Sequence, residues 1–127
     1  MNSALSSAQT DSIIDALAGF GCAVIYVFGS YSKQTVHPGS DIDIAFLPVQ
    51  AVAPIDCFYL ASTLSEKLGK PVDLVDLSTA STVFAKEIVA YGIPLFVGNT
   101  LSYHNFEMYT LSDYARLNEE RREILAG

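Results

Sequence analysis

Two aspartates near a glycine–serine pair are the residues of this 127-residue chain whose types and spacing could do chemistry. Asp41 and Asp43 lie two positions apart in an apolar segment that runs to Leu47. Because successive side chains of a strand alternate between its faces, both carboxylates are expected on one face, with Cα atoms about 6.6 Å apart at roughly 3.3 Å of rise per residue. Two like charges so close on a strand rooted in a core repel each other and lose hydration. A divalent cation would neutralise them, and Mg²⁺ suits the pair because it is usually held by one or two carboxylates together with substrate phosphates.

The glycine–serine pair, Gly29 and Ser30, stands where the preceding apolar run Cys22–Phe28 stops. Glycine lets the backbone turn sharply and approach a ligand closely. The serine offers a hydroxyl, and the amides at the start of a following helix point toward a bound phosphate. Lys33 follows one turn later and could reach a phosphate oxygen. These residues predict a unit that holds phosphate at one end and a metal ion at the other; the alternative is an acidic turn without metal, in which Ser30 caps a short helix.

The full pattern, Gly29-Ser30, ten residues and Asp41-x-Asp43, resembles the signature of the nucleotidyltransferase superfamily in its minimal (MNT) branch. That superfamily includes the repair DNA polymerases of the β type and the aminoglycoside nucleotidyltransferases. The resemblance implies an α/β (α+β) fold, with a small mixed β-sheet flanked by helices and a C-terminal helix. It also implies ATP as substrate and Mg²⁺ as cofactor.

The resemblance implies that Gly29, Ser30 and Lys33 bind phosphate. Many relatives continue the motif with a small residue, arginine and glycine, whereas this chain has Ser32-Lys33-Gln34. Lysine replaces the planar, two-pronged contact of arginine with a point charge. We therefore expect Lys33 to contact phosphate with a different geometry from the arginine of the relatives.

A third carboxylate is implied on the strand beside the one that carries the two aspartates, where it serves as a metal ligand or as a base. Asp73 matches that position because it interrupts the apolar segment Val72–Leu77, much as Asp41 and Asp43 interrupt theirs. Asp76 competes for the role, but a side chain three positions further along a strand faces the other side. We therefore expect Asp41, Asp43 and Asp73 to be the catalytic and metal-ligating residues.

The hydrophobic pattern places these residues on alternating helices and strands. Glycines and prolines mark most of the boundaries between them. The predicted elements are a helix capped by Thr10 or Asp11 and ended by Gly19 and Gly21, a strand at Cys22–Phe28, a short helix after Ser30, a strand at Asp41–Leu47, a helix from about Ile55 to Leu68, a strand at Val72–Leu77, a helix from Ser78 or Thr79 to Gly92, an edge strand at Leu95–Val97 and a helix from Ser102 to Leu125.

Composition limits the function classes. The length predicts one domain over residues 1–127. A net charge of −7 with only seven Lys and Arg argues against direct binding of nucleic acid, which needs clustered basic residues. No apolar run is long enough to cross a bilayer, and the start of the chain lacks a basic segment followed by an apolar one. With two cysteines expected to be reduced, these features predict a cytoplasmic protein that does not bind membranes.

The tail gives a second resemblance. Tyr114-Ala115-Arg116-Leu117, followed by the charged stretch at 118–125, is similar to the end of MNT proteins from HEPN–MNT toxin–antitoxin systems. There the MNT protein is the antitoxin of a HEPN ribonuclease toxin and is thought to transfer AMP from ATP to a toxin tyrosine. A helix at about 102–125 would then contact the partner; the plainer alternative is a packing helix, and both can hold.

Three hypotheses follow from these resemblances. The first is an AMP-transferring antitoxin that acts on a bound HEPN toxin, with the toxin completing a site that this small chain cannot enclose alone. The second is a small-molecule nucleotidyltransferase subunit of the aminoglycoside type. The third is an antitoxin that acts by binding alone.

Overall fold

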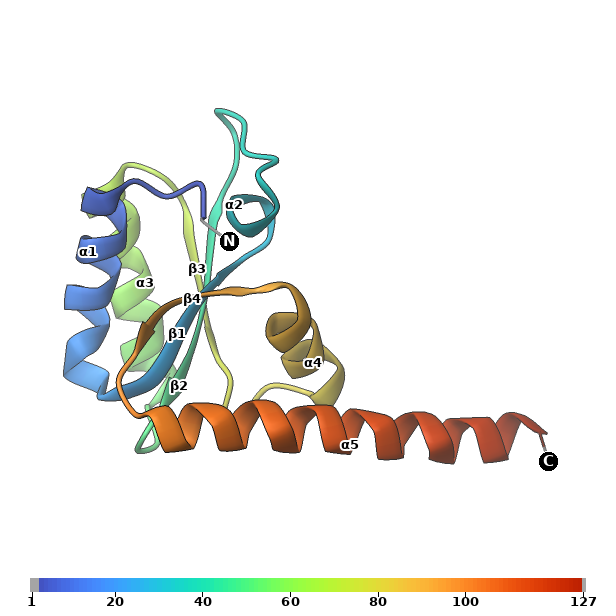
Figure 1. Cartoon of the computed structure of the whole chain (residues 1–127). Coiled ribbons are helices and arrows are strands. Elements are labelled where there is room, and N and C mark those ends of the chain that lie inside the picture. The colour runs from blue at the N-terminus through green and yellow to red at the C-terminus, as the bar shows by residue number, and fades with distance from the viewer. Residues whose placement is uncertain (1–2, 127) are drawn as a thin grey trace.

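Helices and strands alternate along the chain, as Figure 1 shows. The computed structural model describes residues 3–126. Its elements are α1 (Ser7–Leu17), the 3₁₀ turn η1 (Ala18–Phe20), β1 (Cys22–Phe28), α2 (Ser30–Lys33), β2 (Ile42–Pro48), α3 (Pro54–Leu68), β3 (Val72–Asp76), α4 (Thr82–Tyr91), β4 (Ile93–Val97) and α5 (Thr100–Ala126).

The four strands form one mixed sheet in the order β3-β2-β1-β4. β2 and β3 run parallel and are joined across α3, whereas β1 is antiparallel to both of its neighbours. Helices α1 and α3 lie on one face of the sheet and α4 on the other (Figure 1). α5 runs along one end of the sheet, beneath α4, and continues well beyond it to the C-terminus (Figure 1). The predicted mixed sheet flanked by helices, with a C-terminal helix, is confirmed.

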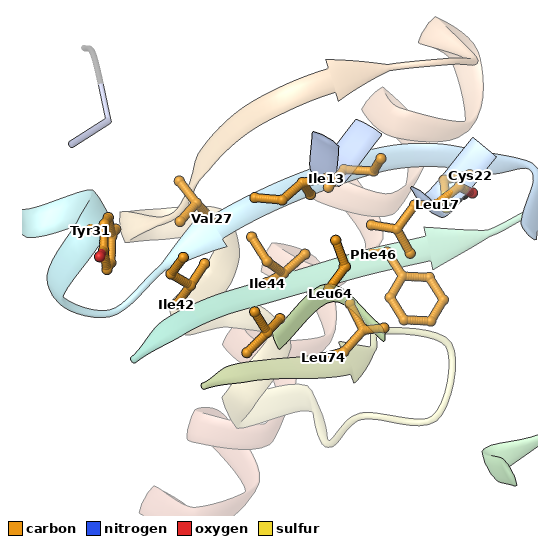
Figure 2. Close-up of a cluster of buried hydrophobic side chains, with 12 residues drawn as sticks. Ile13, Leu17, Cys22, Val27, Tyr31, Ile42, Ile44, Phe46, Leu64 and Leu74 are labelled. Atoms are coloured by element: carbon orange, nitrogen blue, oxygen red, sulfur yellow. Dashed lines mark hydrogen bonds between the residues drawn. The ribbon is translucent and has the colours of Figure 1, made fainter. Parts of the chain in front are cut away.

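Both faces of the sheet are buried. On one face, alternate residues of β2, Ile42, Ile44 and Phe46, pack against Ile13 and Leu17 of α1 and Leu64 of α3, and Figure 2 shows this cluster. On the other face a smaller cluster forms from Val24, Tyr26, Ala45, Leu77 and Ile88, with Phe84 and Phe106 packed against it. Because central strands with two covered faces must be apolar throughout, the continuous run in β1 is explained. Any charged side chain on β2 must therefore lie where the helices leave the sheet open.

α5 is fixed to the sheet by a polar contact as well as by packing. The Tyr26 hydroxyl, fully buried on β1, donates a 3.0 Å hydrogen bond to Glu107 Oε2 of α5. A buried hydroxyl without a partner would cost free energy, so this bond favours one placement of α5. None of the helices formed by residues 3–126 combines the length and apolar character needed to cross a membrane.

Three predicted helix boundaries were wrong, and each has a physical reason. α1 begins at Ser7 because Ser6 and Gln9 form a capping box, a signal that outweighs Thr10 or Asp11 as a cap. α4 begins at Thr82, capped by Ser81, because Ser78 is held in a turn by the Asp76 carboxylate. α5 begins two residues early, at Thr100, because the side chain of Asn99 accepts a 3.0 Å hydrogen bond from the Ser102 amide and caps the helix.

The strand predictions were close. β1 has the predicted bounds, β2 begins one residue later than predicted and ends at Pro48, and β3 ends one residue earlier, at Asp76. β4 begins at Ile93 and so includes Pro94, which sequence reasoning had treated as a break. Proline is tolerated there because β4 is an edge strand.

Candidate active site

The parallel pairing of β2 and β3 brings two aspartates side by side. In this register Asp43 pairs with Asp73, and Phe46 pairs with Asp76. Side chains alternate along each strand, so Asp43 and Asp73 share the face that carries α4, while Asp41 directly precedes the first residue of β2. Asp76 falls in the alternate set with Phe46, toward α1 and α3. The prediction that Asp73, and not Asp76, lies beside the first two aspartates is confirmed in its geometry.

Gly29 lies directly against the second aspartate. Its φ of +68° is in the left-handed region, and a Cβ built on it would collide with Oδ2 of Asp43. The two segments meet because Phe28, the last residue of β1, is the register partner of Asp43. Only glycine meets both demands, a left-handed backbone and contact with a carboxylate. The glycine–serine bend and the acidic strand therefore lie side by side, and their joint role as one site stays a prediction.

Electrostatic strain is concentrated on Asp43. Partial burial, followed by the charges of Asp73 and Asp41, raises its pKa above the ordinary value. Each of these effects disfavours the charged carboxylate. Asp41 and Asp73 are exposed, whereas Asp43 is half-buried. A cation bound here would relieve the repulsion that these three groups create.

The donor set suits Mg²⁺, which prefers oxygen ligands and usually keeps phosphates or waters in its shell. Among residues 3–126, however, no three His, Cys, Asp or Glu side chains lie close enough to form a metal centre on their own. The structure thus brings Asp43 and Asp73 to one face, with Asp41 close enough to act on Asp43, but does not form a ready three-ligand cluster from the described residues. Their metal-binding role stays a prediction, in which substrate oxygens complete the coordination shell.

α2 follows the glycine and carries the predicted phosphate-binding residues. The carbonyl of Gly29 accepts hydrogen bonds from the amides of Ser32 and Lys33 and from the Ser32 hydroxyl, at 3.2, 3.2 and 2.9 Å. Ser32 is therefore buried and engaged within the turn. Ser30 is half-buried and Lys33 is exposed. The geometry leaves Ser30 and Lys33 accessible for a phosphate, and that role stays a prediction.

A turn in the loop that precedes β2 sets the approach to Asp41, and the part played by Ser40 in it was not predicted. Ser40 is buried, and its hydroxyl accepts a 2.9 Å bond from the amide of His37 while its own amide donates to the carbonyl of His37. Nδ1 of His37 accepts a bond from the Gly39 amide. The sequence His37-Pro38-Gly39-Ser40 is rich in turn-forming residues, and that composition was the available signal. These contacts tie down the segment that delivers Asp41 to the site.

Comparison with known proteins agrees with this geometry. The family model described as Polymerase beta, Nucleotidyltransferase matches residues 11–100, which include β1, the bend, β2 and β3. The chain belongs to this nucleotidyltransferase family. The family assignment confirms both the resemblance and the fold that were inferred from the glycine–serine and aspartate pattern.

Three nucleotidyltransferase relatives resemble the chain in sequence or in structure. The chain is 42% identical over 102 residues to the protein adenylyltransferase MntA of Shewanella oneidensis, covering 80% of this chain and 73% of that protein. It also resembles a toxin–antitoxin crystal structure with AMP-PNP, with a TM-score of 0.83 and 39% identity over 92% of this chain and 95% of that one. A third match is a complex of a tri-AMPylated S. oneidensis HEPN toxin with its MNT antitoxin, with a TM-score of 0.80 and 35% identity over 96% and 97% of the two chains.

Proposed function

We propose that this nucleotidyltransferase is an antitoxin that transfers AMP from ATP to a tyrosine hydroxyl of a HEPN toxin and so neutralises it. The observation that carries the proposal is the pairing of Asp43 with Asp73 beside Gly29. The relatives support the acceptor class, since one is a protein adenylyltransferase and another is solved with an AMPylated HEPN toxin. The AMP-PNP complex supports ATP as the donor.

In the proposed reaction the acceptor oxygen attacks the α-phosphorus of ATP in line. The bond from that phosphorus to the oxygen bridging the α- and β-phosphates breaks, and pyrophosphate leaves. Asp73 would receive the proton of the attacking hydroxyl, and its register pairing with Asp43 supports this role. Ser30 and Lys33 would hold the phosphates, and positioning of this kind can supply much of the rate enhancement.

Asp41 and Asp43, with Asp73 nearby, would hold Mg²⁺. When bound, it would acidify the attacking hydroxyl and neutralise the charge that develops on the phosphates. A carboxylate is a weak base, so Asp73 depends on that acidification. The raised pKa of Asp43, caused first by burial and then by Asp73 and Asp41, is what a carboxylate group built to receive a cation would show before the cation binds.

The predicted contact between the C-terminal helix and the partner fits the shape of α5. This helix extends past the rest of the molecule (Figure 1). Three of its large apolar side chains, Met108, Tyr109 and Leu111, are between 48% and 59% exposed, and Ile124 and Leu125 near its end are more exposed still. Exposed apolar side chains gathered on one element are typical of protein interfaces. We propose that α5 contacts the HEPN toxin.

A growth assay separates catalysis from neutralisation by binding alone. Cells expressing a HEPN toxin that forms a complex with this chain would be rescued by the wild-type chain. The Asp43→Asn chain, produced at the same level, would fail to rescue them, whereas Asp15→Asn, which removes an exposed carboxylate of α1, would rescue them. Equal rescue by Asp43→Asn would favour an antitoxin that works by occlusion. Modification of a hydroxylated small molecule without any protein partner would favour the aminoglycoside type of enzyme.

A further inference from the structure

A groove between α3 and the edge strand β3 opens next to the proposed catalytic carboxylates. Its volume is about 690 Å³. Phe58, Ala61 and Ser62 of α3 form one wall, and Val72 and Leu74 of β3 form the other. Pockets for drug-sized ligands span roughly 300–1,000 Å³. A groove of this size could hold several side chains of a peptide, and a single side chain would not fill it.

Asp73 connects the groove with the site. It lines the groove and is also the register partner of Asp43. A molecule seated in the groove would therefore lie beside the carboxylate assigned as proton acceptor.

The chemistry of the groove argues against the nucleotide as its occupant. Asp73 and Asp76 both line it, and no Lys or Arg is among the residues described in its walls. A polyphosphate would be repelled there, whereas an apolar group accompanied by a cationic side chain would be attracted. A protein segment offers both kinds of group within a few residues.

The edge of β3 limits how such a segment can bind. The amide of Val72 donates to Ser65 Oγ at 2.9 Å, and Cys57 Sγ donates to the carbonyl of Leu74 at 3.6 Å. Side chains of α3 thus already occupy backbone groups on the outer edge of the strand. An incoming chain would have to displace them to add a strand, so binding through side chains is favoured over strand addition.

We propose that this groove seats the segment of the acceptor protein that carries the reactive hydroxyl, with an apolar side chain against Phe58 and Leu74 and a Lys or Arg beside Asp73 and Asp76. The proposal rests on the proposed function, since it names the place where the protein acceptor of that reaction binds. It makes Phe58 and Ser62 determinants of affinity for the acceptor with no part in the chemical step.

Two matched pairs of variants on α3 test this groove. Phe58 and Tyr59 are neighbours with exposed fractions of 63% and 62%, but only Phe58 lines the groove. Ser62 and Thr63 are both exposed, and only Ser62 lines it. Because all four side chains are exposed, none of the substitutions is expected to prevent folding.

Steady-state AMP transfer to a HEPN toxin that forms a complex with this chain is the measurement. Phe58→Ala, which removes a wall, and Ser62→Trp, which fills the groove, should each raise the KM for that protein by about tenfold or more, an effect typical of a lost interface anchor. The KM for ATP should stay within about twofold, since the groove is proposed to exclude the nucleotide. Tyr59→Ala and Thr63→Trp should behave as wild type.

The outcomes separate the two proposals. If the wild type transfers AMP and all four variants match it, the groove proposal is overturned while the proposed function stands. If Tyr59→Ala and Thr63→Trp raise the KM for the HEPN protein as much as Phe58→Ala and Ser62→Trp do, the effect belongs to α3 as a whole. The groove proposal is then again overturned. If the wild-type chain transfers nothing to the HEPN protein, the proposed function fails, and this acceptor site fails with it.

Discussion

Asp43 and Asp73 are register partners on two parallel strands, so two carboxylates stand side by side at an open part of the sheet. Gly29 packs against the first of them and leaves no room for a side chain of its own. A fold would ordinarily avoid such a pair, because like charges directly opposite each other destabilise a sheet. The arrangement is explained if the site exists to receive a cation and a phosphate.

Neutralising Asp43 should stabilise the protein while it destroys the activity. Asp43→Asn keeps the shape of the side chain but removes a charge that is partly buried and repelled by Asp73 and Asp41. We expect the free energy of unfolding in the absence of metal to rise by about 0.5–1 kcal/mol, within the range of such stabilising changes, and AMP transfer to fall by more than 100-fold. Urea denaturation and a transfer assay on the same preparation measure both. A decrease in stability would show that the carboxylate is not under strain.

Gly29→Ala should destabilise the protein for two reasons: the substitution strains the backbone, and its Cβ displaces the Asp43 carboxylate. A left-handed backbone costs a residue with a Cβ about 1–2 kcal/mol, and the new Cβ would displace the carboxylate that it meets. We expect a loss of roughly 2 kcal/mol in the free energy of unfolding, together with loss of transfer. Gly19→Ala is the control, because a Cβ there meets open space. Equal stability of the two variants would contradict this account of the bend.

Gln34→Gly should stabilise the chain. Gln34 ends α2 at φ +59°, and it is the sole non-glycine residue with positive φ among residues 3–126. Relatives that place glycine here would avoid the cost of a left-handed backbone, which is about 1 kcal/mol. The variant should therefore unfold at a higher temperature in a calorimetric scan. An unchanged or lower midpoint would mean that the contacts of the glutamine side chain outweigh the backbone cost.

The buried thiol of Cys22 should make stability fall in alkali. Burial, and secondarily the charge of Asp76, raises the pKa of Cys22 from an ordinary 9.0 to about 11. Because the folded state holds this proton more tightly than the unfolded state, its contribution is fully present below pH 9 and is lost as pH rises from about 9 to about 11, by on the order of 2 kcal/mol.

Cys22→Ala tests this loss of stability in alkali. The comparison is between the two proteins in how steeply the free energy of unfolding falls with pH. The variant starts with a lower stability because a buried group is lost, but its free energy of unfolding should fall less steeply between pH 9 and pH 11. Other groups with raised pKa values, such as Cys57, act on both proteins and cancel in the comparison. Parallel curves for the two proteins would contradict the prediction.

The sequence predicted the two central strands and the bend well because their signals are local. The apolar run of β1 and the Gly29-Ser30 step are unambiguous. Asp73 was assigned by family resemblance, and its register against Asp43 depends on how α3 crosses between the strands. That crossing is a matter of tertiary packing, which strand periodicity alone does not define.

The remaining features lay outside what local patterns can predict. The start of α4 was misplaced because Ser78, Thr79 and Ser81 are all suitable caps, and the Asp76 side chain decides among them by holding Ser78 in a turn. The groove forms where α3 packs beside β3, so neither segment predicts it alone. The raised pKa of Asp43 likewise depends on burial and on charges from two strands.

The most direct test is the intact mass of a HEPN toxin that forms a complex with this chain, after incubation with the purified chain, ATP and Mg²⁺. We predict that its mass increases by one or more AMP groups, that peptide mapping places them on tyrosine, and that chelation of the metal prevents the change. Asp73→Asn should abolish the gain, and Asp15→Asn, which removes an exposed carboxylate of α1, should preserve it. An unchanged mass with the wild-type chain, under conditions where the two proteins form a complex, would contradict the account.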